Sequence, residues 1–254
     1  MNQPAPASLR LSVIVPSWND RDNLARVVPA LVRLEEFHEI IVVDAVSEPA
    51  TAQLVRAAGG IYLDAGVPNR GMQMNLGAEN ATGDVLVFHH ADSLLSAAHP
   101  AAIRRALNEP GVIGGAFYRK FDRRHPGMLW FESVARFLTR HGSFFGDQSI
   151  FVGREIFRAL GGFAPIALME DLEFSRRLRR HGQVAVLDPP VESSGRRHLE
   201  RGPWRTTLEN GLLILLYRCA CPPALLHRWY YRDSLPVPNE PVLTAVPLEE
   251  LGPR

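Results

Sequence analysis

Cysteine is scarce in this chain, which holds only Cys219 and Cys221 among its 254 residues. Because they stand one residue apart, they cannot build a disulfide framework or a zinc ribbon, and a reducing compartment suits them. The chain also lacks an unbroken apolar run of the roughly 18 residues that span a membrane. The nearest run, residues 210–227, is broken by Arg218 and by Pro222-Pro223. The net charge of +1 has no strong sign, so we expect no nucleic-acid partner.

The two ends of the chain are poor in large apolar residues at regular spacing. Residues 1–8 have no apolar core of signal-peptide length, so we expect a cytoplasmic protein, with a peripheral position at the inner face of a membrane left open. Residues 233–254 are polar and rich in proline. We expect disorder in both of these segments and a single folded domain over residues 9–232.

Short apolar strands alternate with helices in the first half of the chain, and the pattern is less regular afterwards. The predicted strands are 11–15, 39–43, 61–63, 84–88, 112–121, 150–152 and 183–187. The predicted helices are 21–34, 49–58, 70–80, 127–139, 154–160, 170–180, 204–217 and 223–231. Strands that alternate with helices form a mostly parallel sheet with right-handed crossovers, so the fold class is α/β.

A glycine-rich phosphate loop is absent after the first predicted strand. The segment reads Val15-Pro16-Ser17-Trp18-Asn19-Asp20, which is not the Gly-x-Gly-x-x-Gly of a dinucleotide site. The chain also has no Gly-Lys-Ser/Thr, which excludes a P-loop. Any phosphate must therefore be held in another way. Pro16 and Asn19 are candidates for contact with such a ligand, and a turn with a helix cap is the alternative.

The apolar run Val85-Leu86-Val87-Phe88 stops abruptly at His89-His90-Ala91-Asp92. Ligands of open α/β sheets bind outside the carboxyl ends of the strands, so we expect the chemistry here. A divalent cation that bridges two phosphates needs carboxylate oxygen, which Asp92 can supply. His90 points the same way as Asp92 in an extended segment, so it is either a second metal ligand or a hydrogen-bonded core residue. His89 points the opposite way and is expected to be structural.

Other polar residues follow the predicted strands or open the predicted helices. Asp44 comes after the second strand, where a carboxylate can accept hydrogen bonds from a base or a ribose, or can cap a helix. Arg70 opens a helix, where it can meet an anion or simply be solvated. Glu170 and Asp171 also open a helix. They either complement its dipole or include a general base that deprotonates an acceptor hydroxyl.

Two later segments could contribute to a site or be ordinary surface. Gly146-Asp147-Gln148 precedes a predicted strand and could contact an acceptor or form a turn. Arg196 and Arg197 belong to a late basic loop. Their cationic side chains could neutralise a leaving diphosphate or remain solvated.

Taken together, these positions resemble glycosyltransferase family 2 of the GT-A fold. The matching residues are Val13-Ile14-Val15-Pro16, Asn19, Val42-Val43-Asp44, Arg70, Asn75, Gly77-Ala78, Gly83-Asp84, Asp92, Gly161-Gly162-Phe163 and Glu170-Asp171. Within the family, the chain is most similar to small bacterial enzymes labelled arsenosugar-biosynthesis glycosyltransferases. The segments that carry this closer similarity are His90-Ala91-Asp92, Gly146-Asp147-Gln148, Met169-Glu170-Asp171, Arg196-Arg197 and Gly202-Pro203-Trp204-Arg205-Thr206.

The resemblance implies a three-layer αβα sandwich with a mostly parallel central sheet and a Rossmann-like N-terminal half. Residues 9–95 would bind the nucleotide and residues 96–232 the acceptor. It implies an inverting transfer from a nucleotide-diphosphate sugar to a hydroxyl acceptor. Asp44 would bind the base, Asp92, with or without His90, would hold Mg²⁺ or Mn²⁺, and Asp171 would be the catalytic base, with Glu170 beside it. The remaining residues implied to bind the donor are Pro16, Asn19, Arg70, Asn75 and Ala91.

The chain departs from the family pattern after the second strand, where Asp44-Ala45-Val46-Ser47 replaces Asp-Gly-Gly-Ser. Met72 also stands where relatives commonly have a second arginine. Two further hypotheses remain: a nucleotidyltransferase of similar topology, and a catalytically degenerate protein that binds nucleotide sugars. The acceptor and the oligomeric state are not indicated. A lipid-linked acceptor is one option, because residues 212–216 and 222–231 could form an apolar surface.

Overall fold

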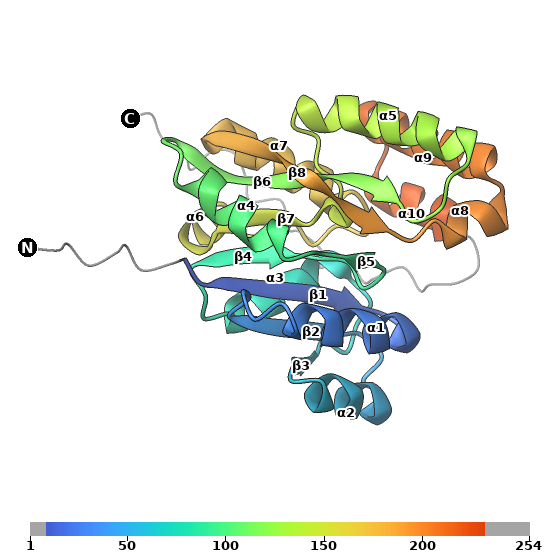
Figure 1. The fold of residues 1–254 in the computed structure, drawn as a ribbon. Helices are drawn as coiled ribbons and strands as arrows, with labels where there is room; N and C mark the ends of the chain where they lie inside the picture. Colours follow the sequence, from blue (N-terminus) through green and yellow to red (C-terminus); the bar gives the residue numbers. More distant parts are fainter. Residues whose placement is uncertain (1–8, 232–254) are drawn as a thin grey trace, which may run out of the picture.

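A computed structural model describes residues 9–231, apart from the side chain of Arg197. The segments 1–8 and 233–254, which we expect to be disordered, lie outside this range. The described residues build one eight-stranded sheet in the order β3-β2-β1-β4-β7-β6-β8-β5 (Figure 1). The strands are β1 (Leu11–Ser17), β2 (Glu39–Asp44), β3 (Ile61–Asp64), β4 (Val85–Phe88), β5 (Ser93–Leu94), β6 (Val112–Phe121), β7 (Ile150–Gly153) and β8 (Gln183–Ser193).

The sheet is mixed but mostly parallel. β1 pairs in parallel with β2 and β4, and β2 with β3, which gives the expected Rossmann-like first half. β7 runs antiparallel to both β4 and β6, and β5 runs antiparallel to β8. In the β1–β2 pair Ser17 lies opposite Asp44, so both strands end at the same edge. Parallel register thus brings polar residues from separate strands to one place.

Helices cover both faces of the sheet, because strand residues alternate between two hydrophobic cores. Val13, Val15 and Val87 face one core, and Ile14, Leu86 and Phe88 face the other. The first core is closed by α1 (Arg21–Val32), α2 (Pro49–Ala57) and α4 (Ala98–Leu107). The second is closed by α3 (Arg70–Asn80), α6 (Arg154–Ala159) and α7 (Glu170–His181). The expected three-layer αβα sandwich is therefore confirmed.

Four further helices extend the molecule beyond the sandwich, at the upper right of Figure 1. They are α5 (Pro126–Arg140), α8 (Arg196–Arg201), α9 (Pro203–Arg218) and α10 (Pro223–Tyr231). α5 packs on β6, α9 packs on α5, and both α8 and α10 pack on α9. A single 3₁₀ turn, η1 (Gly146–Gln148), joins α5 to β7. None of the helices formed by residues 9–231 has the length and apolarity needed to cross a bilayer.

Several elements differ from the expectations. The prediction of a loop at Arg196 and Arg197 is wrong, because these residues begin helix α8. Helix α4 was not expected, since proline in its first turn and few large apolar residues hide its periodicity. β8 continues past its proline pair to Ser193, where it still pairs with β6. β6 is irregular near Gly114-Gly115, because its register with β8 shifts between residues 112 and 114.

Candidate functional site

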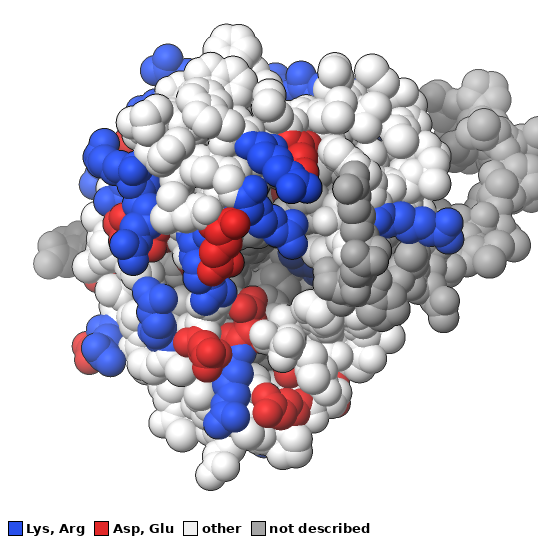
Figure 2. Space-filling model, turned by 90° about the vertical axis from the view of Figure 1, so that its right-hand side faces the viewer, with Lys and Arg blue, Asp and Glu red and all other residues white. Residues whose placement is uncertain are grey.

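Two cavities meet at the carboxyl edge of the sheet. The strand-end cavity, of about 420 Å³, lies between the end of β1, the segment after β4 and the start of α3. The helical cavity, of about 240 Å³, lies between the end of β6, α5, η1, α7 and α9. The residues that line both cavities are Arg70, His90, Asp92, Leu168 and Tyr231. In Figure 2, acidic and basic side chains surround a hollow on this face.

Besides the residues that line both cavities, the strand-end cavity contains the predicted residues Pro16, Asn19, Ala91 and Glu170. The neighbouring strand ends are held together by Gln73 of α3, whose side-chain amide donates to the carbonyls of Ser17 (2.7 Å) and Val43 (2.8 Å). One buried amide thus ties α3 to both β1 and β2. These strand ends, at Ser17 and Val43, form the floor of the site, and Gln73 holds them in place.

Asp44 lies beside this floor but lines neither cavity. It is buried, and its Oδ2 accepts a hydrogen bond from the Tyr62 hydroxyl at 3.1 Å. Burial and the Asp44 carboxylate raise the pKa of Tyr62 to about 12, so the phenol keeps the proton it donates. Asp44 Oδ1 and the nearby Ser17 hydroxyl are buried without a hydrogen-bond partner. Buried polar atoms left in this way are costly unless a ligand or water satisfies them.

The glycines missing after Asp44 do not disturb the turn. The left-handed backbone of this segment falls on Ser47, with φ of 60°, while Ala45 and Val46 have ordinary φ. The Ser47 hydroxyl donates to Asp64 Oδ1 at 2.5 Å. Ala45 and Val46 therefore follow Asp44 without backbone strain.

Asp92 is exposed at the junction of the two cavities, and its Oδ1 accepts only a 3.2 Å hydrogen bond from Ser93. Burial and the adjacent Asp92 carboxylate raise the pKa of Asp20 despite a hydrogen bond from Asn23. A nearby cation would relieve the repulsion between these two carboxylates. Burial and the Arg70 guanidinium lower the pKa of His90, which leaves a neutral imidazole able to act as a ligand.

No cluster of three or more His, Cys, Asp or Glu side chains among residues 9–231 forms a complete metal cage. A cation that bridges phosphates usually takes only one or two protein carboxylates, and the ligand supplies the rest. The donor set of Asp92 with His90 or Asp20 fits that kind of ion. It does not fit a structural metal site.

His89 is structural, as expected. Its Nε2 donates to the Ser93 carbonyl (2.9 Å), and its Nδ1 accepts from the Ser149 hydroxyl (2.7 Å). Burial lowers the pKa of His89 to about 3, so the ring is neutral. It braces the segment that carries His90 and Asp92.

Glu170 and Asp171 divide between the two cavities. Glu170 lines the strand-end cavity and is bonded to Arg70, whereas Asp171 lines the helical cavity. The residue before them, Met169, has φ of 69°, a strained conformation for a non-glycine residue that is typical of functional sites. This backbone turn sets the first residues of α7 against the junction.

Asp171 accepts hydrogen bonds from the backbone N–H groups of Gly146 and Leu172, both at 2.7 Å. Arg70 lies 3.7 Å from it. Burial and the neighbouring Glu170 raise the pKa of Asp171 to about 6 in spite of these partners. A carboxyl with such a pKa can exchange a proton near neutral pH, which is the property of a general base.

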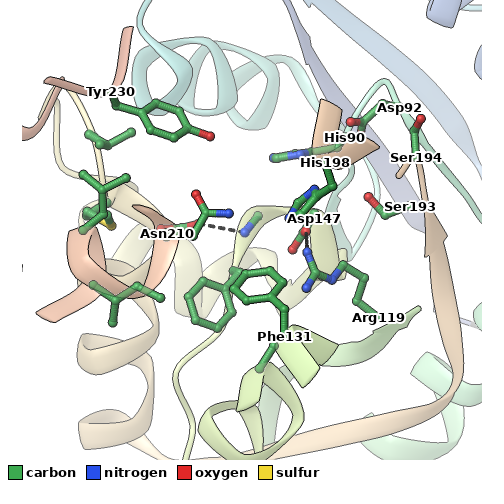
Figure 3. Close-up of a pocket in the computed structure, with 18 of the residues that line it drawn as sticks. His90, Asp92, Arg119, Phe131, Asp147, Ser193, Ser194, His198, Asn210 and Tyr230 are labelled. Atoms are coloured by element: carbon green, nitrogen blue, oxygen red, sulfur yellow. Dashed lines mark hydrogen bonds and ion pairs between the residues drawn. The ribbon is translucent and has the colours of Figure 1, made fainter. Parts of the chain in front are cut away.

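The η1 turn brings two predicted residues into the helical cavity (Figure 3). A Cβ on Gly146 would lie 2.5 Å from His90 Nε2, so only glycine fits beside that imidazole. Asp147 forms a 2.5 Å ion pair with Arg119, a residue of β6. Gln148 is buried and bonded to Phe145 N and to Thr139, and it lines neither cavity.

Two other predicted positions lie outside both cavities. The Asn75 amide makes two hydrogen bonds to the backbone of Phe163, so it ties α3 to the loop before α7. Arg196 is largely exposed on α8, 3.9 Å from Glu200. Arg197 follows it on the same helix.

Many residues that line the cavities were not predicted as site residues, among them Arg119, Asn210 and Tyr231. Arg119 interrupts the apolar strand β6. A charged residue inside an apolar run is a sequence feature that could have indicated a site residue here. Its guanidinium carbon lies 4.4 Å and 4.8 Å from the ring centres of Phe121 and Phe131. Tyr231 ends α10 at the junction, and no sequence pattern indicates that the helix ends there.

Comparisons with known proteins agree with this arrangement at the level of fold. Mannosyltransferase PcManGT from Pyrobaculum calidifontis is 20% identical, with a TM-score of 0.61 over 88% of this chain and 69% of its own. S. aureus TarS 1-349 is 15% identical, with a TM-score of 0.59 over 89% and 73%. Mannosyl-3-phosphoglycerate synthase from Rubrobacter xylanophilus is 19% identical, with a TM-score of 0.53 over 84% and 75%.

No curated protein matches the chain. The family model described as "Glycosyl transferase family 2" matches residues 12–161, which is more than half of the sequence and includes β1 to β4, Asp44, Arg70 and Asp92. The mixed, mostly parallel sheet with helices on both faces is the architecture of GT-A glycosyltransferases. The chain therefore belongs to glycosyl transferase family 2.

Proposed function

We propose that this glycosyltransferase moves a sugar from a nucleotide-diphosphate sugar to a hydroxyl acceptor, with inversion and with a divalent cation, Mg²⁺ or Mn²⁺. The observation that carries the proposal is the junction: Asp92 lines both cavities, while Asp171 lines only the helical one. The donor occupies the strand-end cavity and the acceptor the helical cavity. The reacting sugar lies between them.

The chain's own residues account for each part of this reaction. Ser17, whose buried hydroxyl has no partner, lines the donor cavity and donates a hydrogen bond to the nucleoside. Asp44, directly beside Ser17, has an unpartnered Oδ1 that accepts one from it. Pro16, Asn19 and Ala91 shape the donor cavity. A divalent cation held by Asp92, with His90 beside it, would neutralise the leaving diphosphate. Arg70 adds a cation at the same point.

The chemical step needs a base on the acceptor side. Asp171 takes the proton of the acceptor hydroxyl as its oxygen bonds to the anomeric carbon, and the bond from that carbon to the diphosphate oxygen breaks. One displacement inverts the configuration. Glu170, turned to the other cavity and bonded to Arg70, is a positioning residue in this scheme.

Structural neighbours support the choice of ligands without establishing them for this chain. The Pyrobaculum enzyme is described in complex with GDP-Man and Mn²⁺, and TarS in complex with UDP-GlcNAc. Similarity to arsenosugar-biosynthesis enzymes and a cytoplasmic location remain predictions.

The test is thermal melting with nucleoside diphosphates and Mn²⁺. A ligand at 100 times its Kd stabilises the native state by about 2.7 kcal/mol, which raises the Tm by several degrees. We expect GDP or UDP with Mn²⁺ to give this shift, Asp92→Ala to abolish it, and Asp22→Ala, an exposed aspartate on α1, to keep it. No shift with any nucleoside diphosphate would refute the proposal, and a shift without sugar transfer or donor hydrolysis would favour the degenerate binding protein.

A further inference from the structure

A third hollow, which we call the α5–α9 groove, lies between those two helices and has a volume of about 360 Å³. Its lining is apolar except for Thr207, whose hydroxyl donates to the Gly127 carbonyl at 3.3 Å. A peptide or a sugar bound there would lose hydrogen bonds to water and find no replacements. The lining suits a ligand with no polar groups at all.

The groove adjoins the candidate acceptor site. The two spaces share four lining residues, Phe131, Ala135, Phe145 and Ile214, so only single side chains separate them. A chain bound in the groove therefore ends one side chain away from the acceptor site. This adjacency links the groove to the reaction rather than to an unrelated partner.

The outer walls of the groove leave large apolar side chains in water. Trp130 of α5 is 51% exposed, and Leu208 and Leu215 of α9 are 66% and 57% exposed. The opposite side of α9 is also apolar, since Leu213 packs in the cluster with Leu168 and Leu226. Residues 211–216 of α9 are apolar throughout, yet Leu212 and Leu215 on the groove side stay largely exposed, which favours an apolar ligand there.

At the point where the groove meets the helical cavity stands Arg119, against the ring of Phe131. Its side chain is 94% buried, and its Nε and Nη2 have no hydrogen-bond partner. Unmade hydrogen bonds of a buried guanidinium favour an oxygen-rich group nearby. From the apolar groove into the helical cavity, a ligand would therefore meet first the Arg119 guanidinium and then the Asp171 carboxylate.

We propose that the acceptor is a lipid, with one alkyl, acyl or isoprenyl chain in the α5–α9 groove and a hydroxyl-bearing polar head beside Arg119 and Asp171. This inference rests on the proposed function and names the substrate class of its acceptor cavity. The peripheral membrane position left open by the sequence agrees with it.

The test measures how affinity depends on chain length with a constant head group. The probes are butyl, hexyl and octyl β-glucoside, each below its critical micelle concentration, and the dissociation constant is measured by calorimetry on the full chain. Burial of each methylene should lower Kd about fourfold, or roughly 200-fold from butyl to octyl. Equal Kd values along the series would overturn the proposal.

Gly211→Phe is the variant that fills the groove. Gly211 lines the groove on α9, and a Cβ there meets no atom within 4 Å, so the phenyl ring enters free space without damaging the core. Replacing an interior helix glycine also favours the helix. We expect a melting temperature at or above that of the wild type and a Kd that no longer depends on chain length. A dependence that survives in Gly211→Phe would overturn the assignment.

Ser133→Phe is the matched control, because it adds the same side chain to an exposed position of α5 that does not line the groove. It should keep the full chain-length dependence. A dimer of the wild type that dissociates in Gly211→Phe would assign the groove to a second copy and overturn the lipid. The melting shift with nucleoside diphosphate and Mn²⁺ tests the proposed function separately, so the two failures are distinguishable.

Discussion

Asp171 and Glu170 show that the surroundings of a carboxylate decide its role in the site. They are neighbours at the start of α7 and both are buried, yet they line different cavities. Arg70 donates a hydrogen bond to Glu170 but makes only a 3.7 Å ion pair with Asp171. The sequence offered either acid as the base. The structure separates them because the first residues of a helix point in different directions from its axis.

The pH dependence of transfer tests the role of Asp171. Its pKa is raised to about 6, so the basic form is present above pH 6 and is lost as the pH falls below it. We expect kcat/KM to fall about tenfold per pH unit below 6. Asp171→Asn should lower the rate roughly 10²- to 10⁴-fold at pH 8 and leave no inflection near pH 6. Asp22→Asn serves as the control, and a wild-type profile that is flat through pH 6 would contradict the assignment.

At the scale of elements, the sequence predicted the strand ends well, and these carry half of the site. β-branched runs that stop at Pro16, Asp44 and Asp92 indicate buried parallel strands, and parallel pairing places their ends at one edge. The second cavity was not predictable in this way. Its walls come from α5, α9 and α10, whose packing depends on contacts between segments far apart in the sequence.

Asn75 illustrates a residue whose family pattern was recognised but whose contacts could not be read from sequence. Its amide donates to the Phe163 carbonyl at 2.9 Å and accepts from the Phe163 N–H at 2.8 Å. It joins α3 to the loop that leads to Met169. Its hydrogen bonds thus hold two elements of the site together. A direct contact between Asn75 and the nucleotide stays a prediction.

Asn75→Ala distinguishes these roles. Leaving both Phe163 groups without partners should cost about 1–3 kcal/mol, which lowers the Tm by roughly 2–12 °C. The stabilisation by nucleoside diphosphate and Mn²⁺ should remain. Asn80→Ala, on the same helix, removes only an exposed hydrogen bond to Leu76 and should change the Tm little. An unchanged Tm with loss of the nucleotide effect would show instead that Asn75 binds the donor.

At the scale of the whole molecule, the two halves of the chain share their cores. Val13 and Val87 of the first half pack in one cluster with Phe117 and Phe151 of the second. On the other face, Ile14 and Phe88 share a cluster with Phe174. The sheet itself is continuous, since β4 pairs with β7 over four residues. Neither half can keep its core without the other.

We therefore predict that residues 9–231 unfold as one cooperative unit, as the single domain expected from the sequence requires. The four tryptophans make this measurable, because Trp18 lies in the first half and Trp130, Trp204 and Trp229 lie in the second. In the Trp18→Phe variant, tryptophan fluorescence reports only the unfolding of the second half. The variant with the other three changed to Phe reports only on the first. Coincident denaturant midpoints for both variants, matching far-UV circular dichroism of each, would establish one unit. Midpoints that separate reproducibly would show instead that residues 9–95 and residues 96–231 unfold independently, with the β4–β7 pairing as the boundary.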